Sequence, residues 1–267
     1  MSNTTVIDRK ELTRFAVPSL TELREKRGEN AGARWKPVAF ADMANEVASV
    51  LHSRGHSIKS ERYIVSPDGH DIYSTVVLHE PVKGRTDMTQ AIGWRMSNMQ
   101  RFALRGVSGA SVLVCSNGAI IGDFVFGHRM TSKQEIEVTV GEGMARWGAQ
   151  MDRIGEFYDR MDNTLVTERD ANHVLMTAMR RGILAPSQLG KVIEEFEGER
   201  NRTQFGVART TRALYEAVTE VGKGWSSPRV YERGARGVPA IIAEAFGFDD
   251  LLAPLDGGML SETPSNN

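Results

Sequence analysis

The sequence has 267 residues, with 33 Lys and Arg against 34 Asp and Glu, and 40% of its residues are hydrophobic. This composition is typical of a globular protein, and a single cysteine, Cys115, excludes an intramolecular disulfide and a thiolate-rich metal site. No apolar run approaches the length of about 18 residues that spans a membrane, and residues 1–5 lack the pattern of a secretory signal. We therefore expect a cytoplasmic protein that does not enter a membrane.

The first half of the chain predicts an N-terminal arm followed by a β-rich part. Residues 1–34 are polar and charged, which is typical of an arm that docks late in folding. Within residues 35–133, Asp42 fits the N-cap of a short amphipathic helix that Gly55 would end. Alternating apolar residues on both sides of Pro67-Asp68-Gly69 predict a β-hairpin.

Three further segments add strands to this sheet. Asn117-Gly118 lies between two apolar runs and is a strong signal for a tight hairpin turn. Residues 89–96 and 101–105 also have the character of strands. The sequence thus predicts an antiparallel sheet of about five or six strands in the N-terminal half.

The second half, residues 134–254, shows helical periodicity. A long helix is expected to start near Lys133, a capping box at Thr167 to open the next, and Pro186 to start another. One more helix is expected over residues 208–221, and the Gly-, Ser- and Pro-rich tail 255–267 is expected to be disordered. Strands followed by helices indicate the α+β class, with the helical part packed on the sheet in one domain.

The near-zero net charge conceals alternating blocks of charge. Residues 85–133 carry six basic and two acidic side chains, and residues 200–236 carry eight and three. Residues 134–199 reverse this balance, with thirteen acidic and seven basic side chains. The basic blocks could bind a polyanion, or they could pack against the acidic helices and be neutralised within the molecule.

The stretch 93–106 is the strongest candidate for a binding surface, because it combines three arginines and two aromatic residues with no acidic residue. Arginine neutralises phosphates, and aromatic rings offer stacking surfaces to unpaired bases. Core packing is the alternative for the two rings, Trp94 and Phe102. The predicted nucleic-acid-binding residues are Trp94, Arg95, Asn98, Arg101, Arg105, His128, Arg129, Lys133, Arg209 and Arg212.

Four short segments carry a resemblance to a known family: 93–98 (GWRMSN), 112–117 (VLVCSN), 128–131 (HRMT) and 209–220 (RTTRALYEAVTE). Their order resembles that in the phage/plasmid-like proteins grouped as domain of unknown function 932. Met96 and Met99 stand where that family has polar residues, and Arg129-Met130 separates the His and Thr of its His-Thr pair. The resemblance implies a phage or plasmid origin and brings no established activity with it.

These observations favour a non-enzymatic nucleic-acid-binding protein of a mobile element, of single-stranded DNA binding or annealing type, acting as a homo-oligomer and without a cofactor or metal. One alternative is a protein that binds a host or phage protein through an acidic helix carrying Glu194, Glu195, Glu197 and Glu199. Another is an enzyme that uses Cys115 with His128, or a cluster formed by Asp68, His70 and Asp71.

Overall fold

The computed structural model describes residues 5–27, 37–102, 104–112, 118–119, 124–128, 133–206, 208–222 and 228–252. The strands are β1 (Thr5–Ile7), β2 (Ile58–Val65), β3 (Asp71–Pro81), β4 (Met88–Ser97), β5 (Leu104–Val112), β6 (Gly118–Ala119) and β7 (Phe124–His128). The helices are η1 (Arg9–Arg14), α1 (Leu20–Arg27), α2 (Phe40–Ser53), α3 (Lys133–Asn163), α4 (Glu168–Arg180), α5 (Pro186–Glu197), α6 (Glu199–Phe205), α7 (Thr211–Gly222), α8 (Pro228–Phe246) and α9 (Asp249–Leu252).

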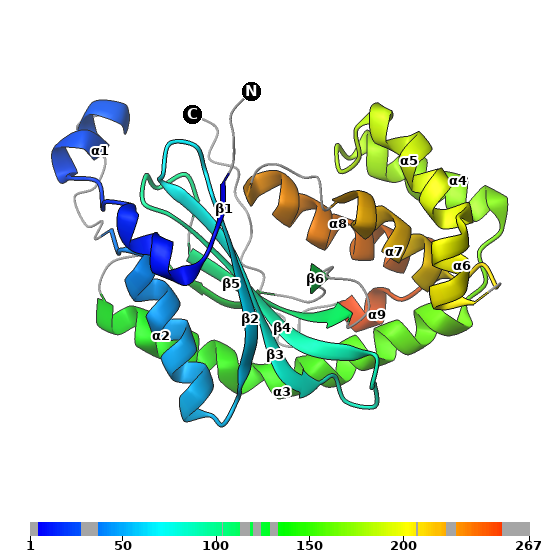
Figure 1. Cartoon of the computed structure of the whole chain (residues 1–267), viewed down its shortest axis with the longest axis horizontal. Coiled ribbons are helices and arrows are strands. Elements are labelled where there is room, and N and C mark those ends of the chain that lie inside the picture. The colour runs from blue at the N-terminus through cyan, green and yellow to red at the C-terminus, as the bar shows by residue number, and fades with distance from the viewer. Residues whose placement is uncertain are drawn as a thin grey trace.

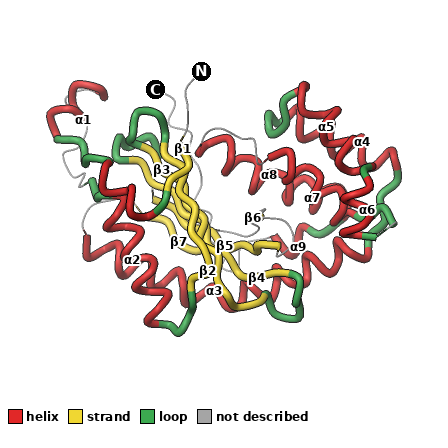
Figure 2. Tube along the Cα trace, viewed as in Figure 1, coloured by secondary structure: helices red, strands yellow, loops and turns green. Residues whose placement is uncertain are grey.

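The strands form one antiparallel sheet in the order β1-β2-β3-β4-β5-β6, and β7 also pairs with β5. Helices α2 and α3 run along one side of the sheet (Figure 1). Helices α4 to α8 gather at one end of the molecule, beyond the strands (Figure 2). This arrangement confirms the predicted α+β class, with the sheet in the N-terminal half and most helices in the C-terminal half.

The local signals in the sequence explain most element boundaries. Gly69 has a φ of +74° in the β2–β3 turn, a conformation that glycine adopts without strain. Thr167 caps α4 and accepts a hydrogen bond from the Asp170 amide, and Pro186 is the first residue of α5. These three predictions are confirmed. Of the predicted turn at Ser116-Asn117-Gly118, only Gly118 is among the described residues, as the first residue of β6.

Three expectations need correction. The strand expected over residues 101–105 begins at Leu104, because Arg101 and Phe102 belong to the turn after β4. The N-cap of α2 is Ala39, and Asp42 lies in the first turn of this helix, where its charge still favours the positive end of the helix dipole. The segment expected to be an arm contributes strand β1, which pairs with β2 from Thr5 to Ile7. Helix α8 was not predicted, because Gly234, Gly237 and Pro239 interrupt its helical pattern.

Both faces of the sheet contribute to the hydrophobic core, and one of them also carries arginines. In an antiparallel sheet, directly paired residues point to the same face, and residues two apart on one strand do so too. On one face lie Tyr63, Val76, Ile92, Trp94 and Met96, all buried within a single hydrophobic cluster that also includes residues of α2 and α3. The other face contributes Ile64, Tyr73 and Val107 to the same cluster and also carries the arginines described below.

Candidate nucleic-acid interface

Three arginines share the second face of the sheet. Arg95 on β4 lies directly opposite Arg105 on β5, and Tyr73 on β3 pairs with Arg95 from the other side. Arg62 on β2 belongs to the neighbouring row of the same face, because its partner Thr75 is two residues from Tyr73. All three arginine side chains are partly exposed. We call Arg62, Arg95 and Arg105 the arginine face.

Several of the residues between these arginines are small. Thr75 and Gly93 pair with each other in the row of Arg62, and Gly127 on β7 pairs with Arg105. Ala91 and Gly109 form the next pair along β4 and β5. Thr75 and Ala91 are nevertheless buried, at 6% and 0% exposed. The row of Arg95 also contains the buried side chains of Tyr73 and Ile64, so the arginines lie beside residues of the hydrophobic core.

Phe102 adds an aromatic ring to this end of the sheet. The centre of the Arg95 guanidinium lies 4.8 Å from the centroid of the Phe102 ring, within the range of a cation–π contact. The turn that carries Phe102 is organised by Ser97, whose hydroxyl accepts hydrogen bonds from the amides of Met99 and Arg101, both at 3.2 Å. The ring and the arginine are therefore held together.

Arg101 also belongs to this turn, and two carboxylates of the same chain bind it. Its Nη1 donates to Asp71 Oδ2 at 2.8 Å, and its Nη2 donates to Asp68. Partial burial tends to raise the pKa of Asp68, but hydrogen bonds from Arg101 and Ser66 outweigh this effect and lower the pKa below its ordinary value. We call Arg101, Asp68 and Asp71 the Arg101 clasp.

Trp94 and Asn98 have structural roles. Trp94 is 1% exposed on the apolar face, and its ring meets that of Tyr63 edge-on at 6.1 Å, so it offers no surface for a base. Asn98 is also buried, and its side-chain amide donates to the Val38 carbonyl at 3.1 Å. Core packing, the alternative for an aromatic ring in this stretch, is therefore correct for Trp94.

The second basic cluster is bound by acidic residues of the same molecule. Arg209 pairs with Glu197 at 3.2 Å, and Arg200 pairs with Glu195 and with Glu220. The charge blocks of the sequence thus neutralise each other at this site. Two of the four glutamates proposed to dock a basic partner have arginine partners within the chain.

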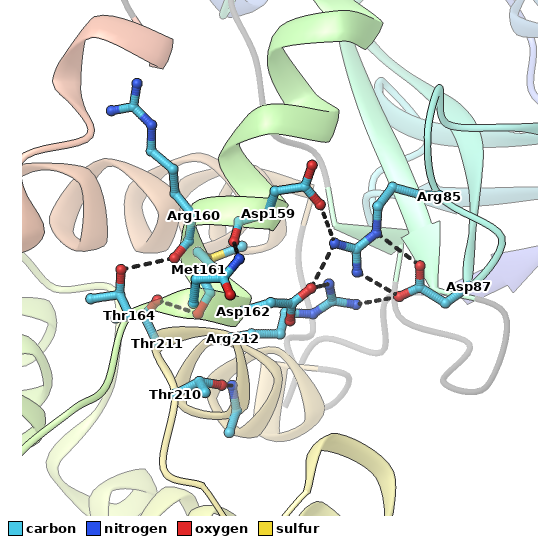
Figure 3. A network of polar contacts seen from close by, with 12 residues as sticks. Arg85, Asp87, Asp159, Arg160, Met161, Asp162, Thr164, Thr210, Thr211 and Arg212 are labelled. Carbon is cyan, nitrogen blue, oxygen red and sulfur yellow. Dashed lines mark hydrogen bonds and ion pairs between the residues drawn. The ribbon is translucent and has the colours of Figure 1, made fainter.

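Arg212 lies inside the protein, where it joins three elements (Figure 3). It is 1% exposed, and its Nε donates to Glu216 Oε1 at 2.7 Å within α7. Its terminal nitrogens face Asp87 of the β3–β4 connection at 3.6 Å and Asp162 of α3 at 3.9 Å. Burial raises the pKa of Glu216, although the charge of Arg212 opposes this change.

A second arginine completes this network. Arg85 bonds to Asp87, with Nε to Oδ1 at 2.9 Å, and its Nη1 reaches Asp159 at 2.7 Å and Asp162 at 2.6 Å (Figure 3). The hairpin between β3 and β4 is thereby tied to α3, and Arg212 ties both to α7. We call Arg85, Asp87, Asp159, Asp162, Arg212 and Glu216 the Arg212 network.

The structure does not bring the two predicted basic clusters together. Arg212 meets Asp87 just before β4 begins, whereas Arg95 lies near the end of this strand. A strand rises about 3.3 Å per residue, which places these two positions about 26 Å apart. Any ligand at the arginine face is therefore remote from Arg212.

Two more of the predicted residues, His128 and Lys133, lie at described positions. His128 is the last residue of β7 and pairs with Leu104 through the backbone, and Lys133 is the first residue of α3. Arg129 and Cys115 lie outside the described residues, so the pairing of Cys115 with His128 is not tested. Among the described residues, no group of three or more His, Cys, Asp or Glu side chains is placed to hold a metal ion.

The second predicted enzyme cluster takes part in the Arg101 clasp. Asp68 and Asp71 bind Arg101, and Asp68 also accepts hydrogen bonds from the Ser66 hydroxyl at 2.6 Å and the His70 amide at 3.2 Å. Lys26 Nζ lies 3.2 Å from His70 Nε2. These contacts connect the β2–β3 turn to the turn after β4 and to helix α1.

Sequence reasoning missed Arg62 and the Arg212 network. The alternation along β2 could have placed Arg62 on the face of Ile64, but which strand pairs with which is a long-range property. The spacing of Arg212 and Glu216 by four residues signals a helical ion pair, yet it does not signal burial.

Comparisons with known proteins add nothing to this geometry: no protein-family model, curated protein or solved structure matches the chain. Among the described residues, no helix is both long enough and apolar enough to cross a membrane.

Proposed function

We propose that this protein binds nucleic acid, preferentially as a single strand, through the arginine face, and that it has no enzymatic role. The observation that carries the proposal is the direct pairing of Arg95 with Arg105 across β4 and β5, with Arg62 on the same face. The Cβ atoms of directly paired residues lie about 5 Å apart, so both guanidinium groups are close enough to contact one phosphate.

The dimensions of the arginine face support a polyanion that is extended. Arg62 on β2 and Arg105 on β5 are separated by three strand spacings, which is about 14 Å. Guanidinium groups bind phosphate oxygens in pairs, and the ring of Phe102 lies beside Arg95 at one end. Proteins that bind single strands without sequence preference use this combination of arginines and aromatic rings.

The origin and the assembly state are also part of the proposal. The resemblance of segments such as 93–98 and 209–220 to a phage/plasmid-like family supports a role in the DNA metabolism of a mobile element. Many proteins that coat single strands act along the strand in several copies, so we propose a homo-oligomer. Analytical ultracentrifugation with and without an oligonucleotide measures this assembly directly.

A salt series tests the proposed function. Fluorescence anisotropy with a labelled single-stranded oligonucleotide should show binding at low salt that weakens as salt rises. The slope of log K against log salt should be about −0.7 for each phosphate contact, so three arginine contacts give about −2. A duplex of the same sequence should bind more weakly. Absence of binding at low salt, or binding insensitive to salt, would contradict the proposal.

A further inference from the structure

Arg101 lies next to the arginine face without belonging to it. Asp71 is on that face, because it is two residues from Tyr73, which pairs with Arg95. Such a diagonal neighbour lies about 7–8 Å away across an antiparallel sheet. Asp71 binds Arg101 through Nη1, so the guanidinium of Arg101 is held at the border of the arginine face.

The Arg101 clasp occupies the groups with which an arginine recognises phosphate. Both terminal nitrogens of Arg101 donate to carboxylate oxygens, one to Asp71 and one to Asp68. Carboxylate and phosphate oxygens bind guanidinium with the same paired geometry. The two aspartates therefore stand where the oxygens of a phosphate would stand.

The clasp is accessible from solvent on its Asp68 side. The side chains of Arg101 and Asp68 are 37% and 39% exposed, whereas that of Asp71 is 13% exposed. An exposed ion pair contributes about 0–1 kcal/mol, so exchange of the Asp68 carboxylate for another anion costs little. By contrast, the serine and backbone contacts of Asp68 fix its position and keep the carboxylate aimed at Arg101.

We propose that Asp68 and Asp71 act as an internal phosphate mimic, which withholds Arg101 from the nucleic acid and lowers the affinity of the arginine face. The inference rests on the proposed function. Removing the two carboxylates releases a fourth arginine at the border of this face. The wild-type chain therefore binds nucleic acid less tightly than a variant in which Arg101 is free to contact a phosphate.

The test is a cycle of variants in the full chain, with anisotropy of a labelled single-stranded oligonucleotide as the readout. Asp68→Asn with Asp71→Asn should raise the affinity about tenfold at low salt, because one charge-assisted contact is added. The salt slope should steepen by about 0.7. Arg101→Ala should abolish the gain when it is added to the asparagine pair.

The matched control is Asp152→Asn with Glu156→Gln on α3, which removes the same charge from exposed residues paired with Lys83 and Arg160. If the control raises affinity as much as the asparagine pair, or if the gain survives Arg101→Ala, the effect is one of net charge and the mimic is rejected. If Asp71→Asn prevents folding, Asp68→Asn with and without Arg101→Ala carries the same test. If the wild type binds the oligonucleotide and the asparagine pair binds it no more tightly, only the phosphate-mimic proposal is rejected. If neither the wild type nor any variant binds, the proposed function is rejected.

Discussion

The Arg101 clasp and the Arg212 network use the same chemistry at opposite ends of β4 and differ in burial. Arg101 is 37% exposed, whereas Arg212 is 1% exposed and is enclosed by α3, α7 and the β3–β4 connection. An exposed pair can exchange its anion for one from solution, while a buried pair cannot be opened without unfolding its surroundings. The comparison shows that an arginine in a basic stretch is a binding residue only where the fold leaves it accessible.

The largest expected effect follows from removing the buried arginine. Arg212→Ala leaves Glu216 buried without its ion-pair partner, so the free energy of unfolding should fall by about 3–5 kcal/mol. Urea denaturation followed by circular dichroism measures the change. Arg212→Met with Glu216→Leu should recover part of the loss, because no charge is then left unpaired. A loss below about 1 kcal/mol for Arg212→Ala would show that the network is not structural.

A glycine in α3 tests how closely the β3–β4 connection is seated beside this network. A Cβ at Gly155 would lie 2.9 Å from the backbone oxygen of Lys83, so Gly155→Ala must push the connection and Arg85 away from α3. The expected loss is about 1–3 kcal/mol in the free energy of unfolding. Gly141→Ala in the same helix meets no atom within 4 Å and should be neutral or slightly stabilising. Equal effects of the two substitutions would contradict the close contact.

Acid should destabilise both the Arg101 clasp and the Arg212 network. Burial opposes the change, but hydrogen bonds from arginine lower the pKa of Asp68 and of Asp87 in the folded protein. A lowered folded pKa gives stability that is present above the ordinary aspartate pKa of about 3.9 and is lost as pH falls through the folded value. Unfolding free energy should therefore be flat near neutral pH with respect to these two groups and fall below about pH 4. Asp68→Asn should reduce this loss by no more than about 1 kcal/mol, because the pair is exposed.

The smallest effect is expected at the second basic cluster. Arg209 and Arg200 are exposed and paired with glutamates, so Arg209→Ala should change the free energy of unfolding by less than about 1 kcal/mol. Thermal unfolding followed by circular dichroism is a sufficient measurement. A large loss there would remove the distinction between exposed and buried arginine pairs.

Local signals in the sequence predicted the elements well, and they failed where long-range contacts decide. The Pro67-Asp68-Gly69 turn, the Thr167 cap and the Pro186 helix start depend on neighbours in sequence, and the structure confirms all three. Arg212 and Arg101 both lie in basic stretches. Neither stretch indicates that Arg212 is buried and Arg101 is exposed. Burial depends on packing between distant segments, such as α7 against α3 and Asp87.

The strand register explains the mixed outcome for the predicted site. Trp94 and Arg95 are adjacent in sequence and were assigned to one surface, but neighbouring residues of a strand point to opposite faces. The structure buries Trp94 in the core and leaves Arg95 partly exposed beside Arg105 and Phe102. Arg62 joins them only through the pairing of β2 with β3.

One contrast tests the central claim most directly. Arg95→Ala with Arg105→Ala and Arg200→Ala with Arg209→Ala remove the same charge from opposite regions of the molecule. The oligonucleotide affinity of both variants is measured at one low salt concentration, after thermal unfolding has shown that both are folded. The account predicts a loss of about a hundredfold for the first variant, since two phosphate contacts are removed, and a change of less than about threefold for the second. Equal losses, or a larger loss for the second variant, would contradict a binding surface on the arginine face.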